Sequence, residues 1–120
     1  MKEIVIILRP SCYFKTKQAL SDHRFFAMNS KEVLGRGRAT VRFTAGEGTA
    51  MTLKEQIYEN ALVAKKMIEI VVPDEAVQEV IDVVLSVNSH GTEGDGKIFV
   101  LPVEESIRIH TGERGDDALI

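Results

Sequence analysis

The chain has 120 residues and a mass of 13.3 kDa, enough for one compact domain and too little for two. Apolar residues make up 44% of it and charged residues 28%, which excludes a disordered tail, a fibrous repeat and a coiled coil. Fifteen basic and eighteen acidic residues give a formal net charge of −3, without the basic stripe of a nucleic-acid binder. We therefore expect one domain over residues 1–120 and no nucleic-acid partner.

Targeting signals are absent from the sequence pattern. The longest early apolar run, Ile4-Val5-Ile6-Ile7-Leu8, is shorter than the core of a signal peptide or a membrane span. The one cysteine, Cys12, cannot form an internal disulfide, which suits a reducing compartment. We expect a cytoplasmic protein without membrane insertion.

The N-terminal elements follow from the hydrophobic pattern. Residues 4–8 form a β-branched-rich run that predicts a buried strand, and Arg9-Pro10 ends it. Residues 14–20 mix apolar and polar side chains in a pattern that predicts a helix. Residues 31–34 predict a second strand, which runs into a cluster of glycines and arginines.

A long connection, residues 39–64, follows with little strand character. Connections in compact domains usually have about 4–6 residues, and those beyond roughly 12–15 are often functional. Thr52-Leu53-Lys54-Glu55 has the capping-box pattern, and Leu53, Ile57 and Ala61 follow at helical spacing. Two interpretations stay open: a third packed helix that enlarges the core, or an exposed arm that docks on a partner.

The second half repeats the order of the first. Residues 67–72 predict a third strand ended by Pro73, and Asp74 is a candidate cap for the next helix. Residues 88–96 are rich in turn formers, residues 97–101 predict a fourth strand, and residues 105–109 a short fifth. The apolar face of the second helix is Val77, Val80, Ile81, Val84 and Val87. The order βαββαβ predicts a ferredoxin-like α+β sandwich with both helices on one face of the sheet.

Gly94-Asp95-Gly96-Lys97, here called the GDGK loop, is the first candidate site. Glycines let successive backbone N–H groups point at an anion, and a lysine adds a positive charge. Phosphate is the obvious ligand, although the same residues also make a plain turn. The loop is not a Walker A motif, because it lacks the six-residue glycine spacing.

Two more clusters combine glycine with basic residues. The segment Gly35-Arg36-Gly37-Arg38 ends a strand. Its arginines could bind phosphate oxygens through two hydrogen bonds each, or the segment could be a strand-end bulge with two solvated arginines. In the third cluster, Arg108 and His110 alternate onto one face of the predicted fifth strand. That arrangement is either a binding face or an exposed polar face.

Catalytic patterns are weak, so we do not expect an enzyme. Cys12 has no activating base nearby in the sequence. His23, His90 and His110 lack the paired spacing of a zinc site, so no metal ligands and no catalytic residues are assigned.

The amino-acid sequences of these clusters and of the strands beside them resemble those of the PII nitrogen-regulatory signal proteins. The matching segments are Ile68 to Asp74 (IEIVVPD), Gly94 to Val100 (GDGKIFV) and Ile107 to Glu113 (IRIHTGE), with Arg9-Pro10 and Glu32 to Arg38 in the same order. The resemblance implies a ferredoxin-like homotrimer that holds ATP or ADP in clefts between neighbouring subunits. It also implies that residues 39–64 are the T-loop, the mobile arm that engages target proteins.

The resemblance assigns roles residue by residue. Gly94, Asp95, Gly96 and Lys97 match the loop that cradles nucleotide phosphates. Gly35, Gly37 and Arg38 match the base of the T-loop against the nucleotide. Arg108 matches a phosphate-binding arginine from the neighbouring subunit, and Lys65 matches the lysine that pairs with a carboxylate of 2-oxoglutarate.

Three positions depart from the family pattern. Ala39 stands where the family usually has a glutamine that helps to hold Mg²⁺ and 2-oxoglutarate, so this ligand pair would need another group. His110 replaces a second arginine, which predicts a pH-sensitive nucleotide affinity. Tyr58 lies in the candidate helix and matches a uridylylation site poorly, so that modification is not expected.

The long T-loop without the usual tyrosine is similar to the nitrogenase-associated branch of the family. That branch implies dinitrogenase as the target, a second PII-like paralogue as a further candidate partner, and ATP with 2-oxoglutarate as the signals. The first alternative is a PII protein that regulates an ammonium transporter or another nitrogen-assimilation target. A different class also stays open: a small-molecule-binding scaffold trimer, or a ferredoxin-like phosphatase or kinase.

Overall fold

The computed structural model describes residues 1–35 and 62–119. This part of the chain holds four strands, two α-helices and three short 3-10 helices. They are β1 (Lys2–Leu8), η1 (Pro10–Cys12), α1 (Tyr13–Asp22), β2 (Met28–Gly35), β3 (Val63–Val72), η2 (Asp74–Ala76), α3 (Val77–Asn88), β4 (Lys97–Pro102) and η3 (Gly115–Leu119).

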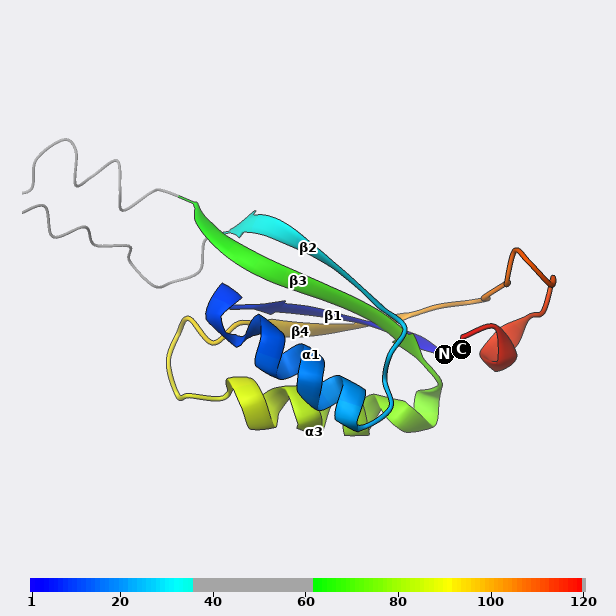
Figure 1. Cartoon of the computed structure of the whole chain (residues 1–120), viewed down its shortest axis with the longest axis horizontal. Coiled ribbons are helices and arrows are strands. Elements are labelled where there is room, and N and C mark those ends of the chain that lie inside the picture. Colours follow the sequence, from blue (N-terminus) through cyan, green and yellow to red (C-terminus); the bar gives the residue numbers. More distant parts are fainter. Residues whose placement is uncertain (36–61, 120) are drawn as a thin grey trace, which may run out of the picture.

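The strands form one sheet in the order β2-β3-β1-β4, in which all neighbours are antiparallel. Helices α1 and α3 lie side by side on one face of this sheet (Figure 1). This is the predicted ferredoxin-like α+β sandwich. We call the other face of the sheet, which no helix covers in the described chain, the open face.

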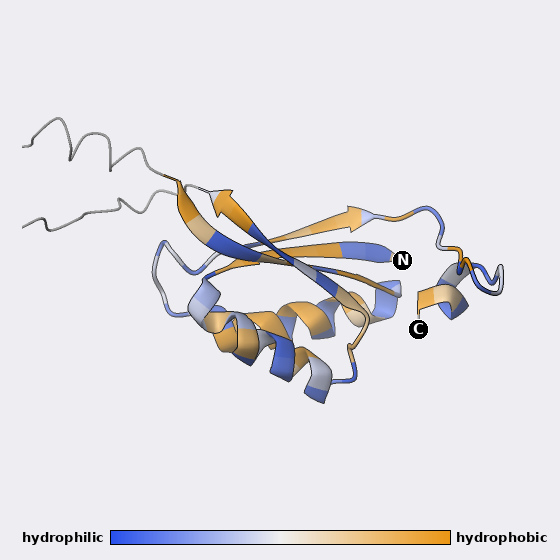
Figure 2. Cartoon of the chain, turned by 45° about the horizontal axis from the view of Figure 1, so that its top comes forward, coloured by the Kyte–Doolittle hydropathy of each residue, from blue (hydrophilic) through white to orange (hydrophobic). Residues whose placement is uncertain are grey.

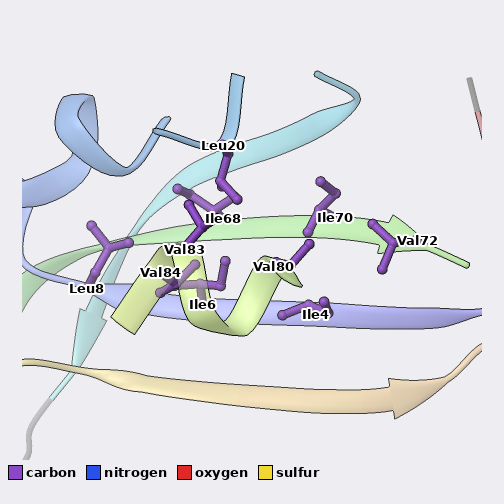
Figure 3. Packing of buried hydrophobic residues seen from close by; sticks show 10 residues of the cluster. All are labelled: Ile4, Ile6, Leu8, Leu20, Ile68, Ile70, Val72, Val80, Val83 and Val84. Carbon is purple, nitrogen blue, oxygen red and sulfur yellow. The ribbon is translucent and has the colours of Figure 1, made fainter. Parts of the chain in front are cut away.

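The core lies between the sheet and the two helices (Figure 3). Strand β1 sends every second side chain into it, as the two-residue repeat of a strand requires. Strand β3 does the same, and α3 contributes residues at helical spacing. The buried hydrophobic residues are Ile4, Ile6, Leu8, Leu20, Ile68, Ile70, Val72, Val80, Val83 and Val84.

The open face carries exposed apolar side chains although nothing in the described chain covers it. Ile98 packs against the core, so its neighbours Lys97 and Phe99 face the other way. Phe99 and Leu101, on the open face, remain 47% and 41% exposed. Hydrophobic residues colour much of the length of the strands (Figure 2). An apolar sheet face of this kind is typical of an interaction surface.

Two boundaries differ from the sequence prediction. Strand β3 begins at Val63, four residues before the predicted start, so Val63 and Ala64 belong to the sheet and not to the long connection. Pairing with β2 extends it, because Gly35 lies opposite Val63 and Val33 opposite Lys65. Residues 39–61 of the connection, which include its candidate helix and Tyr58, lie outside the described residues.

Asp74 does not cap the second helix. That helix begins at Val77, after the turn of η2. The Asp74 carboxylate instead lies 2.9 Å from the Met1 ammonium, and this hydrogen bond, together with the charges of Lys2 and the ammonium, lowers the pKa of Asp74. The predicted apolar face of the helix omitted Val83, which is buried.

The predicted fifth strand over residues 105–109 is wrong. This segment makes one isolated bridge, between Ile107 and Arg114. Gly112, with a φ of +75°, turns the chain back, and the backbone N–H of Arg108 donates to the Glu113 carbonyl over 2.8 Å. The tight turn ends any strand here, so Arg108 and His110 do not share a strand face.

Candidate functional site

Several candidate residues meet at one end of the sheet. Because neighbouring strands are antiparallel, the last residues of β1 and β2 lie beside the first residues of β3 and β4. Gly35, Lys65 and the GDGK loop are therefore gathered at this end, where β2 ends and β3 begins (Figure 1). Gly37, Arg38 and Ala39, which the sequence also places near this end, lie outside the described residues.

Lys65 and Lys97 lie on the open face. Lys97 stands opposite Ile7 in the register of β1 and β4, and Ile7 points away from the core. Lys66 contacts the Tyr13 ring of α1, with 5.1 Å from Nζ to the ring centroid, so its neighbour Lys65 faces away from the helices. The two ammonium groups thus belong to one face, on strands separated only by β1.

The GDGK loop is held by hydrogen bonds to the Asp95 carboxylate. Oδ2 accepts from the backbone N–H groups of His90 and Thr92 over 2.7 and 3.2 Å. Oδ1 accepts from the Thr92 hydroxyl over 2.8 Å and from Arg9 Nη1 over 3.3 Å. The carboxylate is therefore fully engaged within the loop and is not a ligand for an incoming group.

The surroundings of Asp95 favour its charged form. Desolvation raises the pKa of Asp95, but the hydrogen bonds from Thr92 and His90 and the charge of Arg9 together lower it to about 2. At neutral pH the carboxylate is ionised and paired with Arg9. The pair is partly exposed, with 34% of the Arg9 side chain and 20% of the Asp95 side chain open to solvent.

Glycine is required at position 96 by close backbone approach, and position 94 lies against the Arg9 side chain. Gly96 has a φ of +113°, and a Cβ there would lie 1.9 Å from the Ile7 carbonyl oxygen. A Cβ on Gly94 would lie 2.4 Å from Arg9 Nη2. The loop therefore lies directly against the end of β1.

Arg108 and His110 are not brought to this loop. Strand β4 runs from Lys97 to Pro102 away from it, and the C-terminal segment extends from the opposite end of the sheet (Figure 1). Arg108 Nη1 donates to Glu113 Oε2 over 2.5 Å and Nη2 to the Asp117 carbonyl over 2.8 Å. Within one chain, Arg108 and the GDGK loop do not form one site.

A pocket of about 220 Å³ adjoins the loop, between the last turn of α3 and strands β1 and β4. Its lining includes Leu8, Val84, Leu85, Gly96 and Ile98. Ligand sites for small molecules typically measure about 300–1,000 Å³. This pocket is smaller than a nucleotide site requires, so a complete site needs more surface than it supplies.

Sequence reasoning missed two neighbours of the loop. Arg9 was assigned as the end of a strand and as part of the family resemblance, without a role in the site, but its Nη2 donates to the Thr92 hydroxyl over 2.7 Å. The Cys12 Sγ lies 3.8 Å from His90 Nε2, so the cysteine has a base beside it in space that is 78 residues away in sequence. The fold brings the segment that follows β1 close to the segment between α3 and β4, and no local sequence pattern could reveal these contacts.

The described residues hold no group of three or more His, Cys, Asp or Glu side chains that could bind a metal ion. In the same part of the chain, neither helix has the length and apolar character needed to cross a bilayer.

Relatives with assigned names match the chain over its whole length. It is 40% identical to the nitrogen fixation nifHD region GlnB-like protein 2 of Methanobacterium ivanovii, with 100% of both chains covered. It is 41% identical to the protein of the same name from Methanothermobacter marburgensis, covering 99% of this chain and 100% of the other. The nitrogen regulatory protein P-II 2 of Methanothermobacter thermautotrophicus is 40% identical, with 99% and 97% covered.

A solved structure and a family model agree with these relatives. Arabidopsis thaliana PII bound to citrate superposes with a TM-score of 0.74 at 30% identity, covering 98% of this chain and 88% of that one. The family model for nitrogen regulatory protein P-II matches residues 1–113. Relatives named for the nifHD region support the nitrogenase-associated branch, and the chain belongs to the P-II family of nitrogen regulatory proteins.

Proposed function

We propose that this protein is a cytoplasmic nitrogen-status signal that binds ATP or ADP at the GDGK loop and regulates dinitrogenase through residues 39–62. The observation that carries the proposal is the preformed loop. Its Asp95 carboxylate is satisfied by hydrogen bonds within the loop, Gly96 packs against the end of β1, and Lys97 adds a positive charge on the open face.

The second half of the nucleotide site comes from another subunit. Arg108 lies at the opposite end of its own chain from the GDGK loop, so a neighbour's Arg108 must supply the phosphate contact. The apolar open face, with Phe99 and Leu101 exposed, supports assembly through this face. We therefore propose a homotrimer in which each cleft combines two chains, with His110 near the same phosphates.

Lys65 is the proposed partner of a 2-oxoglutarate carboxylate. It lies on the same face as Lys97, one strand beyond β1, so a dicarboxylate beside the nucleotide phosphates would be within reach. Ala39 offers no metal ligand, so Mg²⁺ at this position would be held by the nucleotide phosphates and water.

The target follows from the relatives. Proteins named for the nifHD region are 40% and 41% identical over essentially the whole chain, which favours a nitrogen-fixation target over an ammonium transporter. A second PII-like paralogue is a further proposed partner. Nucleotide and 2-oxoglutarate would bias the arm between target-bound and free forms, and coupling of this kind is reciprocal.

Calorimetry with ATP tests the nucleotide site. Lys97→Ala removes a charge-assisted contact worth about 1.5–3 kcal/mol, so the Kd for ATP should rise roughly 10- to 100-fold. Lys17→Ala, which removes the same charge from the exposed side of α1, is the matched control and should bind as the wild type does. Equal affinity of Lys97→Ala and the control would remove the phosphate assignment.

A further inference from the structure

Arg9 connects the end of β1 to the GDGK loop. Its Nη2 donates to the Thr92 hydroxyl over 2.7 Å, and its Nη1 donates to Asp95 Oδ1 over 3.3 Å. The Thr92 hydroxyl in turn donates to Asp95 Oδ1 over 2.8 Å. The three side chains therefore form a closed triangle of hydrogen bonds, in which each bond polarises the next.

The guanidinium also packs directly against the loop backbone. A Cβ on Gly94 would lie 2.4 Å from Arg9 Nη2 and 3.1 Å from Cζ. The guanidinium therefore lies where a side chain at position 94 would begin, so a larger residue there would displace it.

The positive charge of Arg9 offsets the repulsion between the Asp95 carboxylate and phosphate groups at the proposed site. A carboxylate in a loop that receives phosphate groups repels them, since like charges at short range destabilise each other. Asp95 is needed to shape the loop, because it accepts the His90 and Thr92 N–H groups. Arg9 neutralises it and leaves the charge of Lys97 available to the ligand.

We propose that Arg9 is a positioning residue for nucleotide phosphates: it holds the GDGK loop in shape and cancels the charge of Asp95. This inference rests on the proposed nucleotide function of the loop. It assigns Arg9 no direct contact with the nucleotide. Its effect reaches the phosphates through Asp95, Thr92 and Gly94.

If Arg9 acts by cancelling the charge of Asp95, its loss should weaken binding in proportion to the phosphate charge of the ligand, which a purely structural role would not do. In Arg9→Met the Asp95 carboxylate is left uncompensated, so affinity should fall more for ligands with more phosphate charge. We expect the Kd for ATP to rise roughly tenfold or more, and the Kd for AMP to rise clearly less. In the double variant Arg9→Met/Asp95→Asn the repelling charge is gone, and ATP affinity should recover in part although two hydrogen-bonding groups are lost.

The experiment is calorimetry of ATP and AMP binding to the full chain, with light scattering and a thermal melt for each variant. Arg24→Met makes the same substitution after the far end of α1 and should leave both affinities unchanged. If Arg9→Met does not fold, Arg9→Lys replaces it in the experiment. The lysine keeps the positive charge but cannot donate to Asp95 and Thr92 at once as the guanidinium does. It should weaken ATP binding measurably but less than tenfold, because one of the two hydrogen bonds is lost, while its salt dependence stays that of the wild type.

The outcomes separate this inference from the proposed function. If the wild type binds no ATP, both are overturned. If the wild type binds ATP and Arg9→Met or Arg9→Lys binds it equally well, the inference is wrong and the nucleotide function stands. A double variant no better than Arg9→Met would likewise overturn charge cancellation.

Discussion

Single residues of the GDGK loop show what sequence can reveal and what it cannot. Gly94, Gly96 and Lys97 stand together in the chain, so their chemistry could be predicted from their order. The role of Arg9 could not, because the register that places Ile7 opposite Lys97 is a property of the folded sheet. Likewise the contact of Cys12 with His90 joins residues from the two halves of the fold.

Gly96→Ala should destabilise the protein strongly. The new Cβ would meet the Ile7 carbonyl oxygen at 1.9 Å, at a φ of +113° that alanine rarely adopts, so we expect a loss of about 3–5 kcal/mol in the free energy of unfolding. Gly91→Ala is the matched control. Its φ is +74° but nothing lies within 4 Å, so it should lose only about 1–2 kcal/mol. Urea denaturation measures both, and equal losses would contradict the close approach at Gly96.

Asp95 should contribute to stability in a defined pH range. Its pKa is lowered to about 2 in the folded chain from 3.8, so its ionised form stabilises the fold above pH 3.8. That contribution should disappear as the pH falls from 3.8 through about 2. Thermal melts of the wild type and Asp95→Asn should therefore differ at pH 6 and converge near pH 2. A difference that does not change with pH would show that the carboxylate charge is not involved.

At the scale of elements, the hydrophobic pattern predicted the sheet and both helices, and it failed where pairing or turns decide. The pattern placed the start of β3 at Met67 because Lys65 and Lys66 are charged. Pairing with β2 carries the strand further, and Lys66 is accommodated by Glu32, 3.0 Å away. The segment around Arg108 has strand-like alternation, but the turn at Gly112 prevents a strand.

Deleting residues 41–62 tests the arm that links β2 to β3. The deletion stops before Val63, which pairs with Gly35, so it leaves the register of the two strands intact. We expect a melting temperature close to that of the wild type, unchanged trimer mass and ATP affinity, and no inhibition of purified dinitrogenase. A large drop in melting temperature would favour the packed helix. Full inhibition by the shortened chain would place the docking surface on the body of the protein.

At the scale of the whole molecule, two features make the single chain incomplete. The open face leaves apolar side chains in water, and the proposed phosphate contacts lie at opposite ends of one chain. Both are resolved if neighbouring copies pack through the open face and bring a second chain's C-terminal segment to the GDGK loop. Assembly and nucleotide binding are then properties of the same interface.

Phe99→Glu tests this link between assembly and binding. Phe99 lies on the open face and is 47% exposed, so a carboxylate there would be buried without a partner if that face packs against another chain. We expect light scattering to fall from about 40 kDa for three chains to the 13.3 kDa of one.

The same variant should lose most of its ATP affinity, although its own GDGK loop is intact, because the neighbour's Arg108 is missing. Phe26→Glu is the matched control: Phe26 is 69% exposed but lies in the turn between α1 and β2, so that variant should stay trimeric and bind ATP. A Phe99→Glu chain that remains trimeric would exclude the open face as the interface. A monomer that binds ATP as tightly as the wild type would show that one chain holds the whole site.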